Sequence, residues 1–305
     1  MLNRRDNVIV VTGAGGFLGS RVVPVVRRHA ARARVIAVVR RGGRAVVASG
    51  VEVVRGDLRV SAVWHRLPPN VTHVIHLAAV VPRERRDGNQ PHVIIDNVAP
   101  IAQLLHASTR WMSLRHVVYA SSVSVYAPSR RTLRESSATA PTSAYGAAKL
   151  AGERLLELLA ARGVVVASLR YSSIYGAGQY PGTVLPLFAD RARRGLPLHV
   201  FNARRMQDFL HIEDAARATW LACRLTASGA FNVASGHPVS MATLAREIVD
   251  AFGRLPATTI VEDGGARTGD DGMRVDIGRA RRTLGFRPRI SLRDGLRQLA
   301  HEGRS

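Results

Sequence analysis

Cysteine is nearly absent from this chain of 305 residues, and the single one, Cys223, cannot close an internal disulfide. It lies on an apolar helix face, so we expect it in the core, and nothing requires an oxidising compartment; the expected location is cytoplasmic. No apolar run approaches the ~18 residues that a transmembrane helix needs, so we expect no membrane association. The 11 histidines form neither an HExxH motif nor a cluster with cysteine, and no metal site is predicted.

Lysine and aromatic residues are also scarce. One lysine, Lys149, stands among 44 basic residues, and every other basic residue is arginine. With 22 acidic residues the formal charge is +22, which first suggests a nucleic-acid binder. The arginines, however, are spread from Arg4 to Arg304, and aromatic residues, at 5%, offer little for stacking on bases. We therefore interpret the arginine excess as a coding bias and predict no nucleic-acid binding.

The first half of the chain alternates β-branched runs with longer amphipathic stretches. This alternation predicts parallel βαβ units and hence an α/β fold with a doubly wound parallel sheet of Rossmann type. The strand candidates are apolar throughout, as expected when helices cover both faces of the sheet. Strands are expected at 7–11, 35–39, 51–54, 73–76, 117–120 and 164–169, and helices at 17–32, 61–67, 98–110 and 145–162.

The composition changes after Arg170. Residues 171–183 are rich in Gly, Ser, Tyr and Pro and are expected to form a loop. Shorter elements follow, and Ser291 with Asp294 forms a capping box that predicts the start of the last helix. We expect a Rossmann domain at 1–170 and a small α/β C-terminal substrate lobe at 171–305, partly interleaved with it. The lobe is expected to hold helices at 185–194, 214–225 and 241–252 and a strand at 209–212.

A glycine-rich turn, Thr12–Gly19, follows the first predicted strand directly and opens the first long helix. Glycines at positions 13, 16 and 19 let the chain turn tightly and bring backbone N–H groups against a pyrophosphate. In this strand–turn–helix setting the pattern predicts a dinucleotide-binding site.

The end of the second predicted strand lacks an acidic residue. An NAD-binding fold usually places Asp or Glu here to hold the ribose 2′-OH, but this chain has Arg40, Arg41 and two glycines. Arginine can pair with a 2′-phosphate instead. The missing acid therefore predicts NADP, used as NADPH, with NAD as the alternative.

Tyr145 and Lys149 stand four residues apart at the start of a predicted helix, and two serines, Ser122 and Ser124, follow the fifth strand. Residues at this spacing share a helix face. A tyrosine with a pKa near ~10 is a poor proton shuttle at neutral pH, and we expect the lysine to lower that pKa. A serine hydroxyl can hydrogen-bond the oxygen on which charge changes during hydride transfer. The pattern favours oxidoreductase chemistry over a non-catalytic NADP sensor, which would need neither side chain.

Taken together, these motifs resemble the extended short-chain dehydrogenase/reductase family, the NAD(P)-dependent nucleotide-sugar epimerases, dehydratases and ketoreductases. The resemblance runs from about Val8 to about Leu299. It also includes Arg-Gly-Asp-Leu at 55–58, His-Leu-Ala-Ala at 76–79, Arg-Tyr-Ser-Ser-Ile-Tyr-Gly at 170–176 and Asp-Phe-Leu-His-Ile-Glu-Asp at 208–214.

The resemblance assigns roles to individual residues. Tyr145 would be the acid/base, Lys149 would hold the nicotinamide ribose, and Ser122 would be the catalytic hydroxyl, with Ser124 as the alternative. Substrate contacts would come from Ser173, Gln207 and Arg267. The implied cofactor-binding residues are Gly13, Gly16, Phe17, Leu18, Gly19, Arg40, Arg41, Asp57, Leu58, Leu77, Ala78, Ala79, Asn97, Tyr145 and Lys149.

Departures from the family pattern bear on the reaction. Related 4,6-dehydratases carry an Asp-Glu pair after the catalytic hydroxyl, whereas this chain has Val123 and Ser124, which disfavours dehydration. The leading prediction is NADPH-dependent reduction of a keto group on a nucleotide-activated 4-keto-6-deoxy sugar, with Tyr145 as proton donor. The alternatives are a nucleotide-sugar epimerase and a reductase of a non-sugar carbonyl. The resemblance also implies a homodimer formed through the helices at 98–110 and 145–162.

Overall fold

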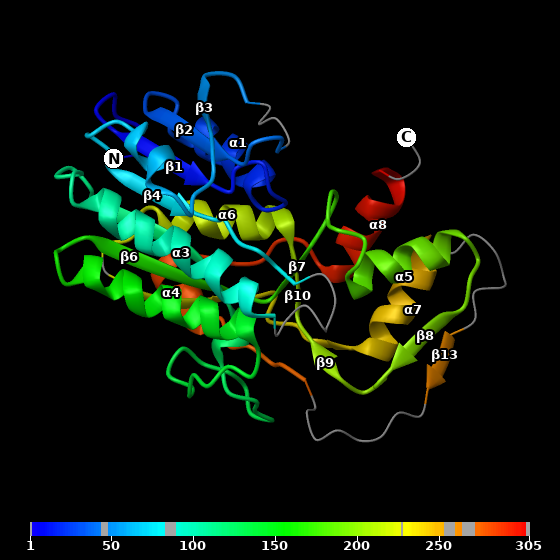
Figure 1. Cartoon of the computed structure of the whole chain (residues 1–305). Coiled ribbons are helices and arrows are strands. Elements are labelled where there is room, and N and C mark those ends of the chain that lie inside the picture. Colours follow the sequence, from blue (N-terminus) through cyan, green and yellow to red (C-terminus); the bar gives the residue numbers. More distant parts are fainter. Residues whose placement is uncertain are drawn as a thin grey trace.

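A parallel seven-stranded sheet forms the centre of the computed structural model, which describes residues 2–43, 48–82, 90–226, 228–252, 260–263 and 272–302. The strand order is β11-β6-β5-β4-β1-β2-β3, and all neighbours are parallel (Figure 1). The order runs in opposite directions on the two sides of β1, as in a doubly wound Rossmann-type sheet, so the predicted fold class is confirmed. The strands are β1 (Val8–Thr12), β2 (Arg34–Val39), β3 (Val51–Arg55), β4 (His73–His76), β5 (His116–Ser122), β6 (Val165–Tyr171) and β11 (Gly229–Val233).

Helices cover both faces of this sheet (Figure 1). Because successive strand residues point to opposite faces, both sets must be apolar. One face carries α1 (Gly19–His29) and α6 (Ile212–Ala222), and the other carries α2 (Ser61–His65), α3 (Pro91–Ser108) and α4 (Ala144–Ala160). In β1, Ile9 and Val11 pack on the side of α1 and α6, while Val8 and Val10 pack beneath α2, α3 and α4. This explains why the strands are apolar throughout rather than alternating.

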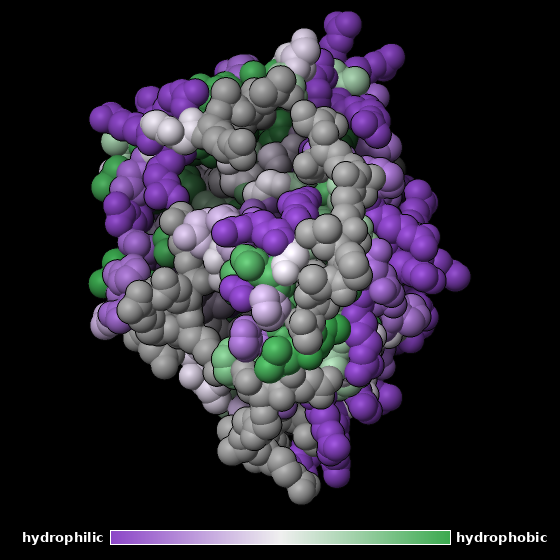
Figure 2. All heavy atoms as spheres, turned by 90° about the vertical axis from the view of Figure 1, so that its right-hand side faces the viewer, coloured by the Kyte–Doolittle hydropathy of each residue, from purple (hydrophilic) through white to green (hydrophobic). Residues whose placement is uncertain are grey.

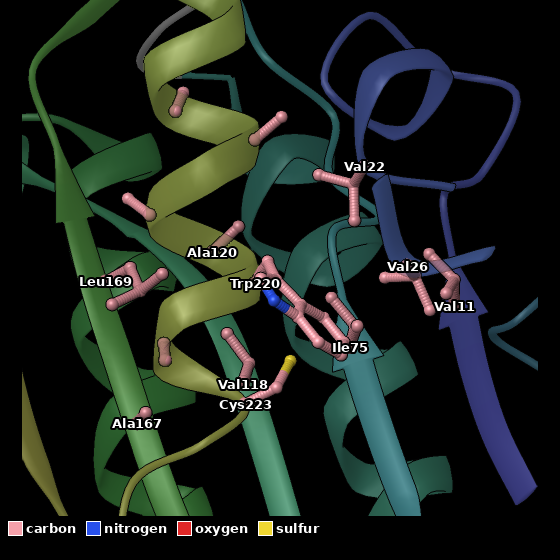
Figure 3. Close-up of a cluster of buried hydrophobic side chains, with 14 of the residues drawn as sticks. Val11, Val22, Val26, Ile75, Val118, Ala120, Ala167, Leu169, Trp220 and Cys223 are labelled. Carbon is pink, nitrogen blue, oxygen red and sulfur yellow. The ribbon is translucent and has the colours of Figure 1, made fainter. Parts of the chain in front are cut away.

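The core beneath α6 contains the single cysteine. Figure 3 shows Trp220 and Cys223, at the end of α6, close to Ile75 of β4 and Val118 of β5. Cys223 is buried, as predicted, and burial raises the pKa of its thiol to about 12. The thiol therefore stays protonated at neutral pH, which makes it a packing group rather than a reactive one.

Two elements of the sheet layer differ from the sequence prediction. The strand β11 was not predicted, because Gly229, Ala230 and Asn232 are poor strand formers. Parallel pairing with β6 stabilises the extended conformation that these residues do not favour by themselves. Helix α3 begins at Pro91 rather than at residue 98, since proline suits the first turn of a helix, where its missing N–H is not needed.

A smaller lobe lies beside the carboxyl ends of the strands and has an apolar core of its own (Figure 1). Its last helix starts after Ser291, whose hydroxyl accepts a hydrogen bond from the Asp294 N–H at 3.1 Å, so the predicted capping box forms. Before that helix, the chain returns to the sheet layer through α6 and β11, both of which follow residue 171. The lobe contains α5 (Val184–Arg193), β8 (Leu198–Phe201), α7 (Met241–Phe252), β13 (Ile260–Asp263) and α8 (Leu292–Glu302), with the short strands β7 (Ser173–Tyr175), β9 (Met206–Gln207), β10 (Phe209–His211) and β12 (Val239–Ser240).

Hydrophilic side chains cover most of the periphery of the lobe face seen in Figure 2. Within the described part of the chain, no helix is both long and apolar enough to cross a membrane.

Three histidines of the sheet are held neutral by burial. Burial lowers the pKa of His76 to about 3 and that of His116 to about 4. The ring of His73 stacks on that of His116 with 5.9 Å between centroids, and its pKa falls to about 3, again mainly through burial. An unfolded histidine titrates near ~6.5, so the unfolded chain binds more protons than the folded chain below that pH. The folded state therefore loses stability as the pH falls from about 6.5 toward about 3.

We expect the free energy of unfolding to decrease by about 2 kcal/mol for each buried histidine between pH 7 and pH 5. Denaturant unfolding at the two pH values measures this decrease. Replacing His116 by glutamine removes one titrating group and should make the decrease smaller, whereas the same replacement of His92, which is exposed on α3, should not. An unchanged pH dependence in His116→Gln would contradict the prediction.

Candidate active site

A cavity of about 950 Å³ opens at the carboxyl ends of the strands, beside the smaller lobe. Its walls come from the turn after β1, the ends of β2, β4, β5 and β6, the start of α4, and residues 179–185 of the lobe apart from Pro181. Open α/β sheets bind ligands at this edge, where the strand order reverses, and the volume falls within the range of ligand sites. The cavity is therefore the candidate active site.

The glycine-rich turn forms one wall of the cavity. Its backbone conformation and the space around it decide whether a dinucleotide would fit there. Gly13 has a φ of +68°, in the left-handed region that favours glycine. A Cβ there would lie only 2.6 Å from the backbone nitrogen of Ala78, and a Cβ on Gly19 would overlap the carbonyl oxygen of Gly13. A side-chain-free backbone at the start of α1 suits the close approach of a pyrophosphate. The residues predicted for this part all line the cavity: Gly13, Gly16, Phe17, Leu18, Gly19, Leu77, Ala78 and Ala79.

The ends of β2 and β3 form the part of the cavity predicted to hold the adenosine. Arg40, Asp57 and Leu58 line it, whereas Arg41 does not belong to the lining; both arginines are exposed. Arg40 contributes to lowering the pKa of Asp57, behind the larger effect of the hydrogen bonds from Arg59. Of the two arginines predicted to pair with a 2′-phosphate, only Arg40 therefore faces this part of the cavity.

Arg59, which the sequence analysis did not single out, also lines this end. It donates hydrogen bonds to Asp57 at 2.6 Å and to Asp96 of α3 at 2.7 Å. Its charge is therefore balanced by two carboxylates. Asp96 lies 37 residues away, and no local pattern in the sequence indicated that pairing.

Ser122, Tyr145 and Lys149 all line the cavity where β5 ends and α4 begins. The Ser122 hydroxyl donates a hydrogen bond at 3.1 Å to the hydroxyl of Ser124, which also lines the cavity, and it is close enough to the Tyr145 phenol to lower the pKa of that group. The Lys149 ammonium lies 5.7 Å from the centre of the Tyr145 ring and donates a hydrogen bond to the carbonyl of Ala120 at 2.7 Å. The sequence-predicted set is therefore brought together in one place.

Local interactions place the start of α4 against the end of β5. The hydroxyl of Ser143 caps the helix by accepting a hydrogen bond from the Gly146 N–H at 3.1 Å. A Cβ on Gly146 would overlap the carbonyl oxygen of Ser124. The glycine after Tyr145 therefore permits the close approach that puts the phenol beside Ser122.

The pKa of Tyr145 differs from the sequence expectation. Burial raises it to about 12, and the hydrogen bond with Ser122 acts in the opposite direction without overcoming burial. The net shift of the Tyr145 pKa is therefore upward, so the expected lowering of this pKa below its ordinary value was wrong. The Lys149 pKa is itself lowered to about 7 by burial, against the opposing charge of Glu153. The phenol is therefore protonated at neutral pH and is set to donate a proton.

Asn97, predicted to bind the cofactor, is buried inside α3 and is not a lining residue. Its side-chain amide donates to the carbonyl of Val80 at 2.9 Å, and its oxygen accepts from the Val80 N–H at 3.1 Å. A further bond goes to the carbonyl of Val93 at 2.7 Å. Asn97 therefore supports the chain after β4, which lines the cavity at Val80 and Val81.

The part of the cavity beside the smaller lobe is lined by polar and aromatic side chains. Ser173 and Gln207, predicted as substrate contacts, line it and share a hydrogen bond from the Gln207 amide to the Ser173 hydroxyl. Arg267 lies outside the described residues. Gln179, Tyr180, Thr183 and Phe209 also line the wall but were not singled out, although the Gly-, Tyr- and Pro-rich loop after Arg170 could have indicated the first three.

Comparison with known proteins identifies related chains. Residues 9–234 match the NAD dependent epimerase/dehydratase family. The dTDP-glucose 4,6-dehydratase of an Actinoplanes species is 27% identical, over 94% of this chain and 95% of that protein. UDP-glucuronate 4-epimerase 3 of Arabidopsis thaliana is 26% identical, over 97% of this chain and 76% of that protein.

A solved structure, that of MoeE5 in complex with UDP-glucuronic acid and NAD, superposes with a TM-score of 0.83. The two chains are 31% identical, and the superposition covers 98% of this chain and 99% of the other. The match extends over the sheet layer and the smaller lobe alike.

Proposed function

The chain belongs to the NAD dependent epimerase/dehydratase family and is an enzyme of the extended short-chain dehydrogenase/reductase type, and we propose that it epimerises a nucleotide-activated sugar at a hydroxyl-bearing carbon. The observation that carries this proposal is the set of Ser122, Tyr145 and Lys149 facing a cavity whose catalytic part is lined by no carboxylate among the described residues. The named reactions of the relatives include epimerisation, dehydration and, in one trifunctional protein, reduction of a keto-sugar, and the side chains present favour epimerisation over dehydration.

In this reaction the side chains of the enzyme carry out the proton transfer. Tyr145 exchanges a proton between its phenol oxygen and the oxygen on the reacting sugar carbon, while the Ser122 hydroxyl hydrogen-bonds that same oxygen. Lys149, buried beside Tyr145, would hold the ribose of a bound nicotinamide cofactor. A bound nicotinamide cofactor would supply the hydride acceptor and donor. Tyr145 is protonated in this structure and therefore suited to the half-reaction in which a carbonyl oxygen receives a proton.

Dehydration needs a further acid/base pair to remove a hydroxyl and a proton from neighbouring carbons. The two residues after Ser122 are Val123 and Ser124, and the carboxylates that line the cavity, Asp57 and Asp96, both pair with Arg59 at the other end. Within the described residues no carboxylate is therefore available beside Tyr145, which supports epimerisation over dehydration.

The test is incubation of the purified enzyme with a panel of UDP- and dTDP-hexoses and their 4-keto derivatives, with NAD or NADP in both redox states. An isomerised sugar of unchanged mass, without net change in nicotinamide absorbance, supports the epimerase. Consumption of reduced cofactor with a mass gain of two hydrogens contradicts it and supports a ketoreductase. Loss of water contradicts both assignments.

Reduction of a keto-sugar with NADPH is the second candidate, because Arg40 lines the adenosine end and residues 40–43 contain no acid. We propose that Arg40 pairs with a 2′-phosphate, which favours NADP. Replacing Arg40 by alanine should then weaken NADPH binding by about tenfold or more, with little effect on NADH, because a charge-assisted bond is worth about 1.5–3 kcal/mol. Titration of the enzyme with NADPH and with NADH measures the ratio of the two affinities.

Arg41→Ala serves as the matched control for Arg40→Ala. It removes the same charge from the next residue, whose side chain is exposed and does not line the cavity. We expect its ratio of NADPH to NADH affinity to remain that of the unmodified enzyme. A preference for NAD in the unmodified enzyme would end the proposal for a 2′-phosphate site.

A further inference from the structure

The face of α4 that carries Tyr145 and Lys149 continues inward to a third ionisable residue, Glu153. The three side chains are four residues apart and follow one another along one face of the helix. Lys149 is 1% exposed and Glu153 is 6% exposed. Glu153 is thus a carboxylate in the interior, one helical turn beyond the lysine of the proposed active site.

Glu153 is bound by both strands that pack against α4. Arg170 of β6 donates from Nε to one carboxylate oxygen at 3.0 Å and from a terminal nitrogen to the other at 2.7 Å. Ser121 of β5 donates its hydroxyl to the first of these oxygens. A two-point contact with arginine strongly restricts the orientation of a carboxylate. Because Ser121 directly precedes Ser122, the same carboxylate also ties down the strand end that bears the proposed catalytic hydroxyl.

Arg170 is itself held from its other side. Its guanidinium lies 4.8 Å from the centre of the Tyr126 ring and donates a hydrogen bond to the carbonyl of Glu135 at 3.3 Å. The Tyr126 hydroxyl donates in turn to the side-chain oxygen of Asn232, in β11, at 2.6 Å. The ion pair is therefore supported from α4, β5, β6, β11 and the chain after β5.

A buried ion pair contributes little net stability, because the cost of removing both charges from water cancels most of their attraction. Its effect on Lys149 is more direct. Burial alone favours the neutral amine and lowers the Lys149 pKa, whereas the negative charge of Glu153 raises it. The tyrosines and the histidine that face Lys149 are neutral at pH 7, since burial raises the pKa of the first two and lowers that of the third: Tyr119 of β5, Tyr145 of α4 and His76 of β4. The other charge in this part of the interior is that of Arg170 of β6, which is paired with Glu153.

We propose that Glu153, oriented by Arg170, is a positioning residue that favours the charged form of the Lys149 side chain beneath Tyr145. This proposal depends on the proposed function, because that function gives Lys149 the role of holding the cofactor ribose. Glu153 does not reach the cavity, so it acts through the lysine and through Ser121, not on the substrate.

The test uses the fact that Lys149 is the chain's only lysine. Protein labelled with 13C at lysine Cε gives one lysine signal, and its shift as a function of pH measures the protonation of Lys149 without substrate or cofactor. In Glu153→Gln we expect the proton-binding constant of Lys149 to fall by about tenfold or more, because a negative charge in a poorly solvated site is lost.

Glu153→Gln leaves the buried Arg170 charge unpaired, which destabilises the fold, so the double variant Glu153→Gln, Arg170→Gln is measured beside it. This variant removes both charges and keeps two hydrogen-bonding side chains. We expect the proton-binding constant of Lys149 to fall in the double variant as well, since Glu153 is the charge that opposes burial at the lysine.

Glu157→Gln is the matched control, because Glu157 lies one turn further along α4, is exposed and pairs with Arg154. We expect it to leave the Lys149 titration unchanged. A folded Glu153 variant, single or double, in which Lys149 titrates as in the unmodified protein would overturn the proposal, as would an equal change in Glu157→Gln. Because the measurement contains no substrate, these outcomes are distinct from failure of the epimerase assay. Where turnover is observed, its alkaline limb should move to lower pH in Glu153→Gln.

Discussion

Replacing Tyr145 by phenylalanine should lower the turnover of a nucleotide sugar by roughly 10²- to 10⁴-fold, the usual contribution of a positioned proton donor. The Tyr145 ring lies 5.7 Å from the buried Lys149 ammonium, and its phenol is protonated at neutral pH. Phenylalanine keeps the ring and removes the oxygen that carries the proton. Initial rates with saturating cofactor, and titration of cofactor binding, separate a loss of chemistry from a loss of binding.

Tyr119→Phe is the matched control for Tyr145→Phe. Tyr119 is buried in β5, does not line the cavity, and its hydroxyl has no hydrogen-bond partner among the described residues. Removing that hydroxyl breaks no described bond, so turnover should stay within a few-fold of the unmodified enzyme, on the scale of a near-neutral change. Retention of turnover in Tyr145→Phe would refute the assignment of this tyrosine as the proton donor.

Replacing Gly13 by alanine should reduce cofactor affinity by about tenfold or more and destabilise the fold by more than the 1–2 kcal/mol that a left-handed alanine costs. The added Cβ would lie 2.6 Å from the nitrogen and 2.7 Å from the Cα of Ala78. Both are backbone atoms, so relief requires a shift of the turn or of the chain after β4. Either shift alters the surface that would receive the pyrophosphate. Denaturant unfolding and cofactor titration measure the two effects.

Gly285→Ala separates backbone strain from collision. Gly285 has a φ of +67°, almost the +68° of Gly13, but a Cβ there would meet no described atom within 4 Å. We expect only the strain of a left-handed alanine in this variant, and unchanged cofactor affinity. Equal destabilisation by the two substitutions would show that the contact with Ala78 carries no cost.

Much of the sheet layer was predictable because its signals are local. Continuous β-branched runs marked six of the seven strands, and the strand β11 escaped because residues such as Gly229 and Asn232 have no strand preference of their own. The glycine turn and the spacing of Tyr145 and Lys149 depend on neighbours within a few residues. These features therefore indicated the family and the position of the cavity.

The details of the site depend on contacts between distant segments. The sequence presented Arg40 and Arg41 as equivalent, but only the first lines the cavity. It suggested that Asn97 meets the cofactor, whereas its amide holds the chain after β4. The Tyr145 pKa was misjudged for a related reason, because burial is set by the surrounding elements and not by the lysine four residues away.

The amino-acid sequence on its own determined the fold class, the glycine turn and the pairing of the single lysine with a tyrosine one helical turn away, since periodicity and short spacing encode all three. The scarcity of lysine made Lys149 conspicuous but could not show what surrounds it. Tertiary folding brought Glu153 and Arg170 together beside that lysine, joined Arg59 to Asp96, and kept the Tyr145 phenol protonated. Burial and long-range pairing have no local signature, and so these properties of the site emerge only when the chain is folded.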